Sequence, residues 1–155
     1  MERFRKSIEK LKEFPGVARS CPTTACVSAV DTLRRSLADG AAAADALPPL
    51  FPFALDEFQT DALAALDDGL SVVVSSPTGS GKTVIAELAI YLALASGGRA
   101  VYTTPLKALS NQKFGELQRK FGRDSVGLLT GDARVNPDAP ILVMTTEVYR
   151  NMLFA

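Results

Sequence analysis

The chain has 155 residues, nearly half of them hydrophobic, and its 17 basic residues balance its 17 acidic ones. This length and composition are typical of a globular protein with a sizeable core, and they exclude a disordered or fibrous chain. No stretch of about 20 apolar residues occurs, so the sequence predicts no membrane-spanning helix. The chain contains no His, which excludes a histidine base or a histidine-liganded metal within it.

The charges are unevenly distributed along the chain. Residues 36–81 contain seven acids and no Lys or Arg, whereas residues 82–123 contain seven bases and two acids. A polyanion that binds this protein would be expected on the basic half. The alternative is that these charges line solvated helix faces, and the distribution alone does not separate the two.

The first 50 residues are expected to form an extension that carries no chemistry of its own. Residues 1–14 show apolar side chains at helical spacing, residues 31–37 suggest a short helix, and residues 41–46 are of low complexity. Cys21 and Cys26 lack a second pair to complete a zinc site, so unpaired thiols of a soluble intracellular protein are expected. We therefore predict an extension at 1–50 and a domain at 51–155.

The second part opens with a predicted helix that ends at Gly69, preceded by acidic residues and two phenylalanines. Gln59 lies in its first turns, and an amide can pair with both a donor and an acceptor on the edge of adenine. A nearby aromatic ring such as Phe53 can stack on a base. The alternative, a surface glutamine and a core phenylalanine, is favoured by the spacing alone.

A glycine-rich segment follows, with the sequence Ser76-Pro77-Thr78-Gly79-Ser80-Gly81-Lys82-Thr83. β-Branched residues precede it and an apolar run follows it, so a strand, a tight turn and a helix are predicted in that order. Successive N–H groups at the start of such a helix bind phosphate, Lys82 can reach the terminal phosphates, and the Thr83 hydroxyl can hold Mg²⁺. The strict pattern begins with Gly where this chain has Ser76, which we interpret as the mark of a subtype.

Strands and helices alternate through the rest of the chain, which predicts a parallel sheet with right-handed crossovers. The expected strands are 71–75, 99–103, 126–129 and 141–144, and the expected helices are 82–96, 106–121 and a last one after residue 144. Thr104 and Pro105 are expected at the cap and first position of the second of these helices.

The last three expected strands end in small hydroxyl-bearing or glycine residues. Ligands bind at the carboxyl ends of strands in open α/β sheets, and each of these ends offers backbone N–H groups, a hydroxyl or a helix start that suits a phosphate. Lys107 and Lys113 add charge near one of them. Phosphate-sized sites in a row would follow a single-stranded nucleic-acid backbone without reading its bases. Ordinary caps and turns are the alternative.

Five segments resemble the superkiller-type DExH-box RNA helicases of superfamily 2, and in particular their plant chloroplast and cyanobacterial members. They are 53–59, 77–83, 104–113, 127–132 and 144–153, and the resemblance covers about 51–155. It implies a P-loop NTPase fold, a partial RecA-like α/β domain with a parallel sheet flanked by helices, preceded by a helical N-terminal segment. An ATP-dependent RNA helicase is the implied function, with ATP and Mg²⁺ as cofactors and single-stranded RNA as partner.

The resemblance also implies roles for individual residues. The residues expected to contact the nucleotide are Phe53, Gln59, Pro77, Thr78, Gly79, Ser80, Gly81, Lys82 and Thr83. Of these, Lys82 and Thr83 would be catalytic, and Thr83 would support the metal. Nucleic-acid contacts fall to Thr104, Pro105, Lys107, Gly131, Asp132, Thr145 and Thr146, on the edge of the sheet where the phosphate loop lies.

The Asp-Glu-x-His segment of that family would follow the last helix, and the printed sequence stops before it. We therefore expect the N-terminal portion of a helicase, or a truncated gene model, with negligible ATP hydrolysis by itself. A DNA translocase of the same superfamily and a non-catalytic nucleotide- or nucleic-acid-binding module are the alternatives. The compartment, whether chloroplast, cytoplasm or nucleus, stays open.

Overall fold

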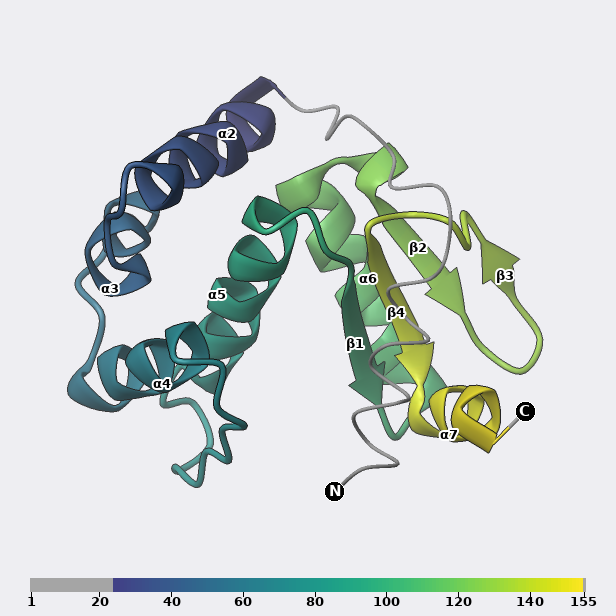
Figure 1. The fold of residues 1–155 in the computed structure, drawn as a ribbon. Coiled ribbons are helices and arrows are strands. Elements are labelled where there is room, and N and C mark those ends of the chain that lie inside the picture. The colour runs from purple at the N-terminus through teal and green to yellow at the C-terminus, as the bar shows by residue number, and fades with distance from the viewer. Residues whose placement is uncertain (1–23, 155) are drawn as a thin grey trace. The chain divides into compact units, whose positions relative to one another are not determined.

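The computed structural model describes residues 24–154, which form two compact units (Figure 1). One unit is Ser28–Ser96, and the other contains the residues from Gly97 onward. The helix expected at 1–14 and the thiol of Cys21 lie outside the described residues. Within 24–154 no helix combines the length and the apolar character needed to cross a membrane.

The first unit is built from helices. They are α2 (Thr24–Ala38), α3 (Ala43–Ala46), a 3-10 helix (Pro48–Leu50), α4 (Glu57–Asp67) and α5 (Lys82–Ala95). The helix expected at 31–37 is therefore longer than predicted, and the low-complexity segment at 41–46 contains a short helix. The expected helices before Gly69 and from Lys82 are confirmed as α4 and α5.

The core of this unit consists of aliphatic side chains from several of its helices. α4 packs beside α5, and Leu63 of α4 and Leu88 of α5 are completely buried (Figure 1). Leu33 of α2 and Leu47 before the 3-10 helix are buried as fully. α2 and the residues around α3 therefore belong to this core. Burying one such side chain stabilises a fold by roughly 1.5–3 kcal/mol.

The strand expected at 71–75 is not formed. Residues 70–76 have no regular secondary structure, and Val73 is 96% exposed. The β-branched run has the right propensity, but a strand also needs a neighbour to accept and donate its backbone hydrogen bonds. Among the described residues, none pairs with this segment.

The second unit holds a four-stranded sheet in the order β1-β4-β2-β3 (Figure 1). The strands are β1 (Ala100–Thr104), β2 (Val126–Leu129), β3 (Arg134–Val135) and β4 (Ile141–Thr145), and the helices are α6 (Lys107–Phe121) and α7 (Thr146–Phe154). β1, β4 and β2 are parallel, as predicted, whereas β3 pairs with β2 in the antiparallel sense. β3 was not predicted because it has only two residues, both exposed.

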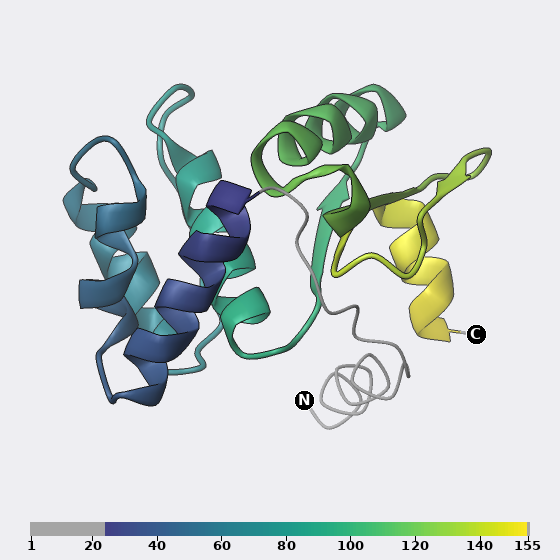
Figure 2. The ribbon, with the colours of Figure 1, turned by 90° about the horizontal axis from the view of Figure 1, so that it is seen from above.

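Helices cover the sheet of the second unit, with α6 on one side and α7 leaving the end of β4 toward the other (Figure 2). Leu117 and Phe121 of α6 are buried together with Ile141 and Val143 of β4. These side chains form the core between the helix and the sheet of this α/β unit. The strands are apolar on both faces, which is typical of a parallel sheet covered by helices.

Close packing explains one glycine in the middle of the sheet. A Cβ atom at Gly127 of β2 would lie 2.0 Å from the Asn136 carbonyl oxygen and 2.9 Å from a methyl group of Leu142. The loop after β3 therefore crosses directly against this backbone, which only glycine permits.

The start of α6 differs from the prediction. The helix begins at Lys107, its N-cap is Leu106 in an extended conformation, and Pro105 lies outside it. Thr104 is the last residue of β1 and is paired with Thr145 of β4, so the chain stays extended beyond the strand end. The Thr104 hydroxyl donates to the Leu106 carbonyl oxygen at 3.0 Å instead of capping helix amides.

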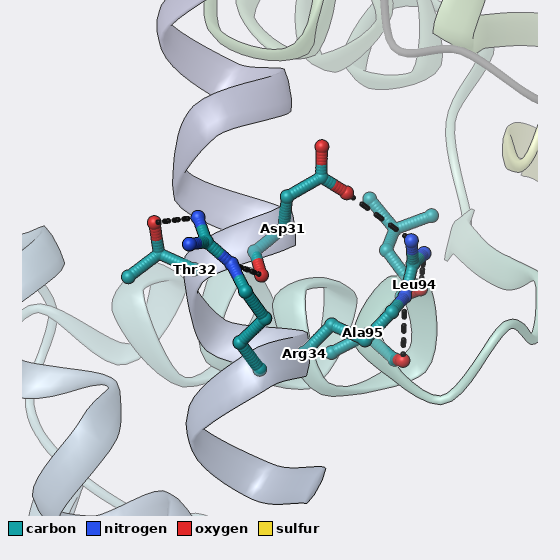
Figure 3. Close-up of polar contacts among 6 residues, drawn as sticks. Asp31, Thr32, Arg34, Leu94 and Ala95 are labelled. Carbon is teal, nitrogen blue, oxygen red and sulfur yellow. Dashed lines mark hydrogen bonds and ion pairs between the residues drawn. The ribbon is translucent and has the colours of Figure 1, made fainter.

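A polar contact ties α2 to the far end of α5 (Figure 3). The Arg34 guanidinium donates to the carbonyl oxygens of Leu94, at 3.1 Å, and Ala95, at 3.3 Å, and it pairs with Asp31 at 3.1 Å. Carbonyls in the last turn of a helix have no partner within the helix and carry its negative dipole end. Arg34 therefore caps α5 from the neighbouring helix.

We predict that Arg34→Ala lowers the free energy of unfolding by about 1–2 kcal/mol, because two helix-end carbonyls lose a charged donor. Arg35→Ala is the matched control, since the partners of Arg35 within residues 24–154 are Asp31 and Thr32 of its own helix. Urea denaturation of the purified chain, followed by circular dichroism, measures both. Equal losses in the two variants would contradict the capping role.

Candidate functional site

The glycine-rich loop leads directly into α5, as predicted. Gly79 and Gly81 have φ angles of +86° and +82°, in the left-handed region that other residues rarely adopt. Gly81 is also the N-cap of α5. The two glycines thus set the turn that brings the loop to the first residue of the helix.

Backbone donors are available in this turn. In the described part of the chain, no group accepts a hydrogen bond from the amides of Gly79, Gly81 or Lys82, whereas the Ser80 amide donates to the Pro77 carbonyl oxygen at 3.3 Å. The donors lie at the positive end of a 14-residue helix. Such an arrangement binds anions, because the N–H groups and the helix dipole act together.

Lys82 bends back toward the beginning of the loop. Its ammonium group donates to the carbonyl oxygens of Ser76 and Pro77, each at 2.5 Å. The hydroxyls of Ser76 and Ser80 lie 2.5 Å apart and are hydrogen-bonded. The serine that replaces the usual glycine at position 76 therefore contributes a hydroxyl to the internal bonding of the loop.

Gln59 joins α4 to this loop. Its side chain is only 3% exposed, its Oε1 accepts from the Asp56 amide at 3.0 Å, and its Nε2 donates to the Gly81 carbonyl oxygen at 3.1 Å. A Cβ atom at Gly81 would lie 2.7 Å from that Nε2. The surface-glutamine alternative is therefore wrong, and Gln59 supports the left-handed turn from below the helix start.

An aromatic pair lies before α4. Phe51 is buried, and its ring centroid is 5.6 Å from that of Phe53 and 6.2 Å from that of Tyr91 on α5. Phe53 is 49% exposed. Its ring is thus held on one side by Phe51 and is accessible to a planar ligand, which a core phenylalanine would not be.

The remaining loop residues are at the surface. Pro77, Thr78 and Thr83 are exposed, and Thr83 lies in the first turn of α5. Among residues 24–154, no three His, Cys, Asp or Glu side chains are grouped so as to hold a metal ion. A metal at this loop would therefore need ligand oxygens in addition to the Thr83 hydroxyl.

The second unit brings the three predicted strand ends to one edge of its sheet. Thr104 and Thr145 are register partners at the ends of β1 and β4, and Leu129 at the end of β2 pairs with Met144. Because all three strands run parallel, Thr104, Thr145 and Gly131, which lies two residues after β2, share the carboxyl edge. This part of the prediction is confirmed.

The edge residues differ in what they expose. Thr104 is 6% exposed, and its hydroxyl lies 2.6 Å from that of Ser110, which is completely buried in α6. Pro105, Gly131 and Thr146 are exposed. The Thr104 hydroxyl therefore bonds within the β1–α6 connection. The accessible groups at this edge belong to Pro105, Gly131 and Thr146.

Two loops of this edge are joined by an ion pair. The Lys107 ammonium at the start of α6 bonds to the carboxylate of Asp132, which follows β2. The Thr130 hydroxyl donates to the other carboxylate oxygen at 3.0 Å. The hydrogen bond from Lys107, and to a lesser extent the one from Thr130, hold the pKa of Asp132 below its ordinary value.

The second predicted basic residue, Lys113, is paired as well. Its ammonium lies 2.6 Å from the Glu116 carboxylate on the same helix. This bond, and a further one from Gln112, lower the pKa of Glu116. The two lysines expected to add positive charge to the edge therefore both face carboxylates in this structure.

Two supporting residues were not predicted. Ser110 looks like an ordinary helix residue in the sequence, and no signal marks it as the partner of Thr104. Asp56 could have been found, because an acidic or hydroxyl residue three positions before a glutamine is the sequence signature of a capping box. That pattern would have assigned Gln59 to the start of α4 as a backbone partner.

Comparison with known proteins identifies a family model and several relatives that match this chain. The sequence model described as "DEAD/DEAH box helicase" matches residues 56–154. "Probable helicase HelY" of Mycobacterium leprae is 62% identical over 104 residues, 67% of this chain and 11% of that protein. The "DExH-box ATP-dependent RNA helicase DExH15 chloroplastic" of Arabidopsis thaliana is 57% identical over 110 residues, which are 71% and 9% of the two chains.

A third relative is the "ATP-dependent RNA helicase mtr4" of Schizosaccharomyces pombe, 51% identical over 110 residues, 70% of this chain and 10% of that protein. The chain thus spans about a tenth of the length of these relatives. The mycobacterial relative exceeds the chloroplast one in identity, so the predicted special likeness to plant chloroplast members is not borne out, whereas the likeness to DExH-box helicases is confirmed.

We predict that Gln59→Glu lowers the free energy of unfolding by about 1–3 kcal/mol, because a carboxylate oxygen replaces the donor that faces the Gly81 carbonyl. The change keeps the shape of the side chain. Gln118→Glu on α6 is the matched control and should change the stability by less than about 0.5 kcal/mol. Urea denaturation measures both, and an equally stable Gln59→Glu protein would rule out the supporting role.

Proposed function

Because this chain belongs to the DEAD/DEAH box helicase family, we propose that residues 51–155 are the ATP-binding part of an ATP-dependent RNA helicase. The whole protein would couple ATP hydrolysis to movement along single-stranded nucleic acid. The observation that carries this proposal is the loop before α5, where Lys82, a helix start and amides that have no acceptor among the described residues converge.

In this proposal the polyphosphate of ATP binds at Gly79–Lys82. The amides of this segment donate to phosphate oxygens, and the Lys82 ammonium exchanges two carbonyl partners for the terminal phosphates. The bonds from the Lys82 ammonium to the two carbonyls are already charge-assisted, but a phosphate oxygen carries a negative charge that a carbonyl lacks, so a phosphate adds a Coulomb attraction and competes well for Lys82. Pro77, Thr78 and Ser80 complete the loop around the phosphates.

Adenine would lie against Phe53 and Gln59. Gln59 is 3% exposed and each atom of its amide holds one partner in this structure, so the amide would exchange these partners and turn toward the nucleotide to pair with the edge of the base. The exposed face of Phe53 offers a stacking surface. Phe53 precedes α4 and Gln59 lies in its first turn, so the base would be recognised by the helix that supports the loop.

Magnesium fits this site through Thr83. Its side chain is exposed in the first turn of α5, directly after the phosphate-binding lysine. A bound Mg²⁺ ion offsets the negative charge that develops on the phosphates during transfer. The chain itself would contribute the Thr83 hydroxyl as a ligand, and phosphate oxygens and water would supply the other ligands.

The nucleic acid would bind at the carboxyl edge of the sheet in the second unit. Pro105, Gly131 and Thr146 are exposed there, and Lys107 and Asp132 lie on the two loops beside them. Thr104 and Thr145 are register partners at the same edge. Backbone amides and helix starts at this edge suit phosphate contacts, which follow a strand without reading its bases.

We predict that Lys82→Ala abolishes ATP binding and RNA-stimulated ATP hydrolysis by the full-length protein, because the terminal phosphates lose their ammonium partner. The rate should fall by at least about 100-fold, as expected when one charge-stabilising donor is lost. Fluorescent-nucleotide binding and a phosphate-release assay measure the two effects. Lys120→Ala on α6 serves as the matched control and should keep both activities.

Normal turnover by Lys82→Ala would overturn the proposed role of the loop. Oligonucleotide stimulation then separates the alternatives: preferential stimulation by RNA supports an RNA helicase, and equal or greater stimulation by DNA supports a DNA translocase. ATP binding without any stimulated turnover would support the non-catalytic module. Steady turnover by the 155-residue chain alone would contradict the expectation that it is inactive by itself.

A further inference from the structure

The ion pair between Lys107 and Asp132 places a carboxylate where the proposed function expects a phosphate. Lys107 begins α6 and Asp132 follows β2, so the pair spans the loops of two strand ends that belong to the same edge. Both side chains are more than half exposed, at 53% and 62%. The edge therefore carries its own anion, and the lysine adds no net positive charge while it is paired.

The carboxylate is held in place by the turn that carries it. Thr130 donates its hydroxyl to Asp132, and the same hydroxyl accepts a hydrogen bond from the Ala133 amide at 3.1 Å. The Thr130 amide donates to the Ala133 carbonyl oxygen at 2.9 Å, which closes the turn. Asp132 is thus positioned by its own loop, independently of Lys107.

We propose that the Asp132 carboxylate competes with the nucleic acid for Lys107. It occupies Lys107 until a backbone phosphate displaces it, and it thereby limits the affinity of the edge for nucleic acid. This inference rests on the proposed nucleic-acid function of the edge. An exposed ion pair contributes only about 0–1 kcal/mol, so a phosphate can replace the carboxylate at little cost. A strand that must slide along the edge gains from contacts that exchange readily.

The test is a double-mutant cycle on binding of a fluorescein-labelled oligouridylate by the full-length protein, followed by fluorescence anisotropy over a range of salt concentrations. The variants are Asp132→Asn, Lys107→Gln and the double substitution. Asp138→Asn is the matched control, because it removes one exposed acid from the same unit without touching Lys107. Thermal unfolding of each variant verifies that the fold is kept.

We expect Asp132→Asn to bind the oligouridylate about 2- to 5-fold more tightly, as the loss of an exposed competing pair implies. The log–log slope of its salt dependence should stay close to that of the natural protein, because Lys107 binds a phosphate in both complexes, whereas Lys107→Gln should make the slope shallower by about 0.7. The gain should vanish in the Lys107→Gln background and be absent from Asp138→Asn.

Unchanged or weaker binding by Asp132→Asn would overturn the inference while leaving the proposed function intact. A gain that persists without Lys107, or that Asp138→Asn reproduces, would also overturn it, because the effect would then be general charge. If neither the natural protein nor any variant binds the oligouridylate, the nucleic-acid role of the edge fails and the inference fails with it.

Discussion

The left-handed turn at Gly81 is the constraint on which the proposed nucleotide site depends. It directs the chain from the loop into α5; glycine adopts this conformation without strain, and the Gln59 amide donates to its carbonyl oxygen. Any side chain at Gly81 would meet Gln59 at once. The helix start, the amides of the loop and the Lys82 side chain all take their positions from this turn, so α4 is part of the site.

The residues before the family match contribute to the same unit. Leu33 and Leu47 are buried in its core, and Arg34 bonds to the last carbonyls of α5. α5 is therefore bonded at both ends, by Gln59 near its first residue and by Arg34 at its last. A helix fixed in this way can present its N-terminal amides in one orientation, which is the preorganisation that phosphate binding requires.

Much of this could be predicted from the sequence. The glycine-rich loop, α5 and the strand ends follow from local patterns, because glycine conformation, helical spacing and β-branched runs act within a few residues. The prediction of a strand at 71–75 was wrong, because a strand also depends on a neighbouring strand and no local pattern supplies one. The Thr104–Ser110 bond and the pairing of Lys107 with Asp132 depend on how distant loops fold together, which spacing does not specify. The special likeness to chloroplast helicases rested on shared motifs, and over the matched residues the mycobacterial relative is more similar to this chain than the chloroplast one, at 62% against 57% identity.

The central claim is that the amides of Gly79, Gly81 and Lys82 hold a polyphosphate. Nuclear magnetic resonance of the isotopically labelled protein tests it directly, with ATP and AMP compared at saturating concentrations in the presence of Mg²⁺. The account predicts that ATP shifts the amide signals of these three residues and that AMP, which has the base but only one phosphate, leaves them nearly unchanged. Equal shifts with both nucleotides, or no shift with ATP, would contradict it.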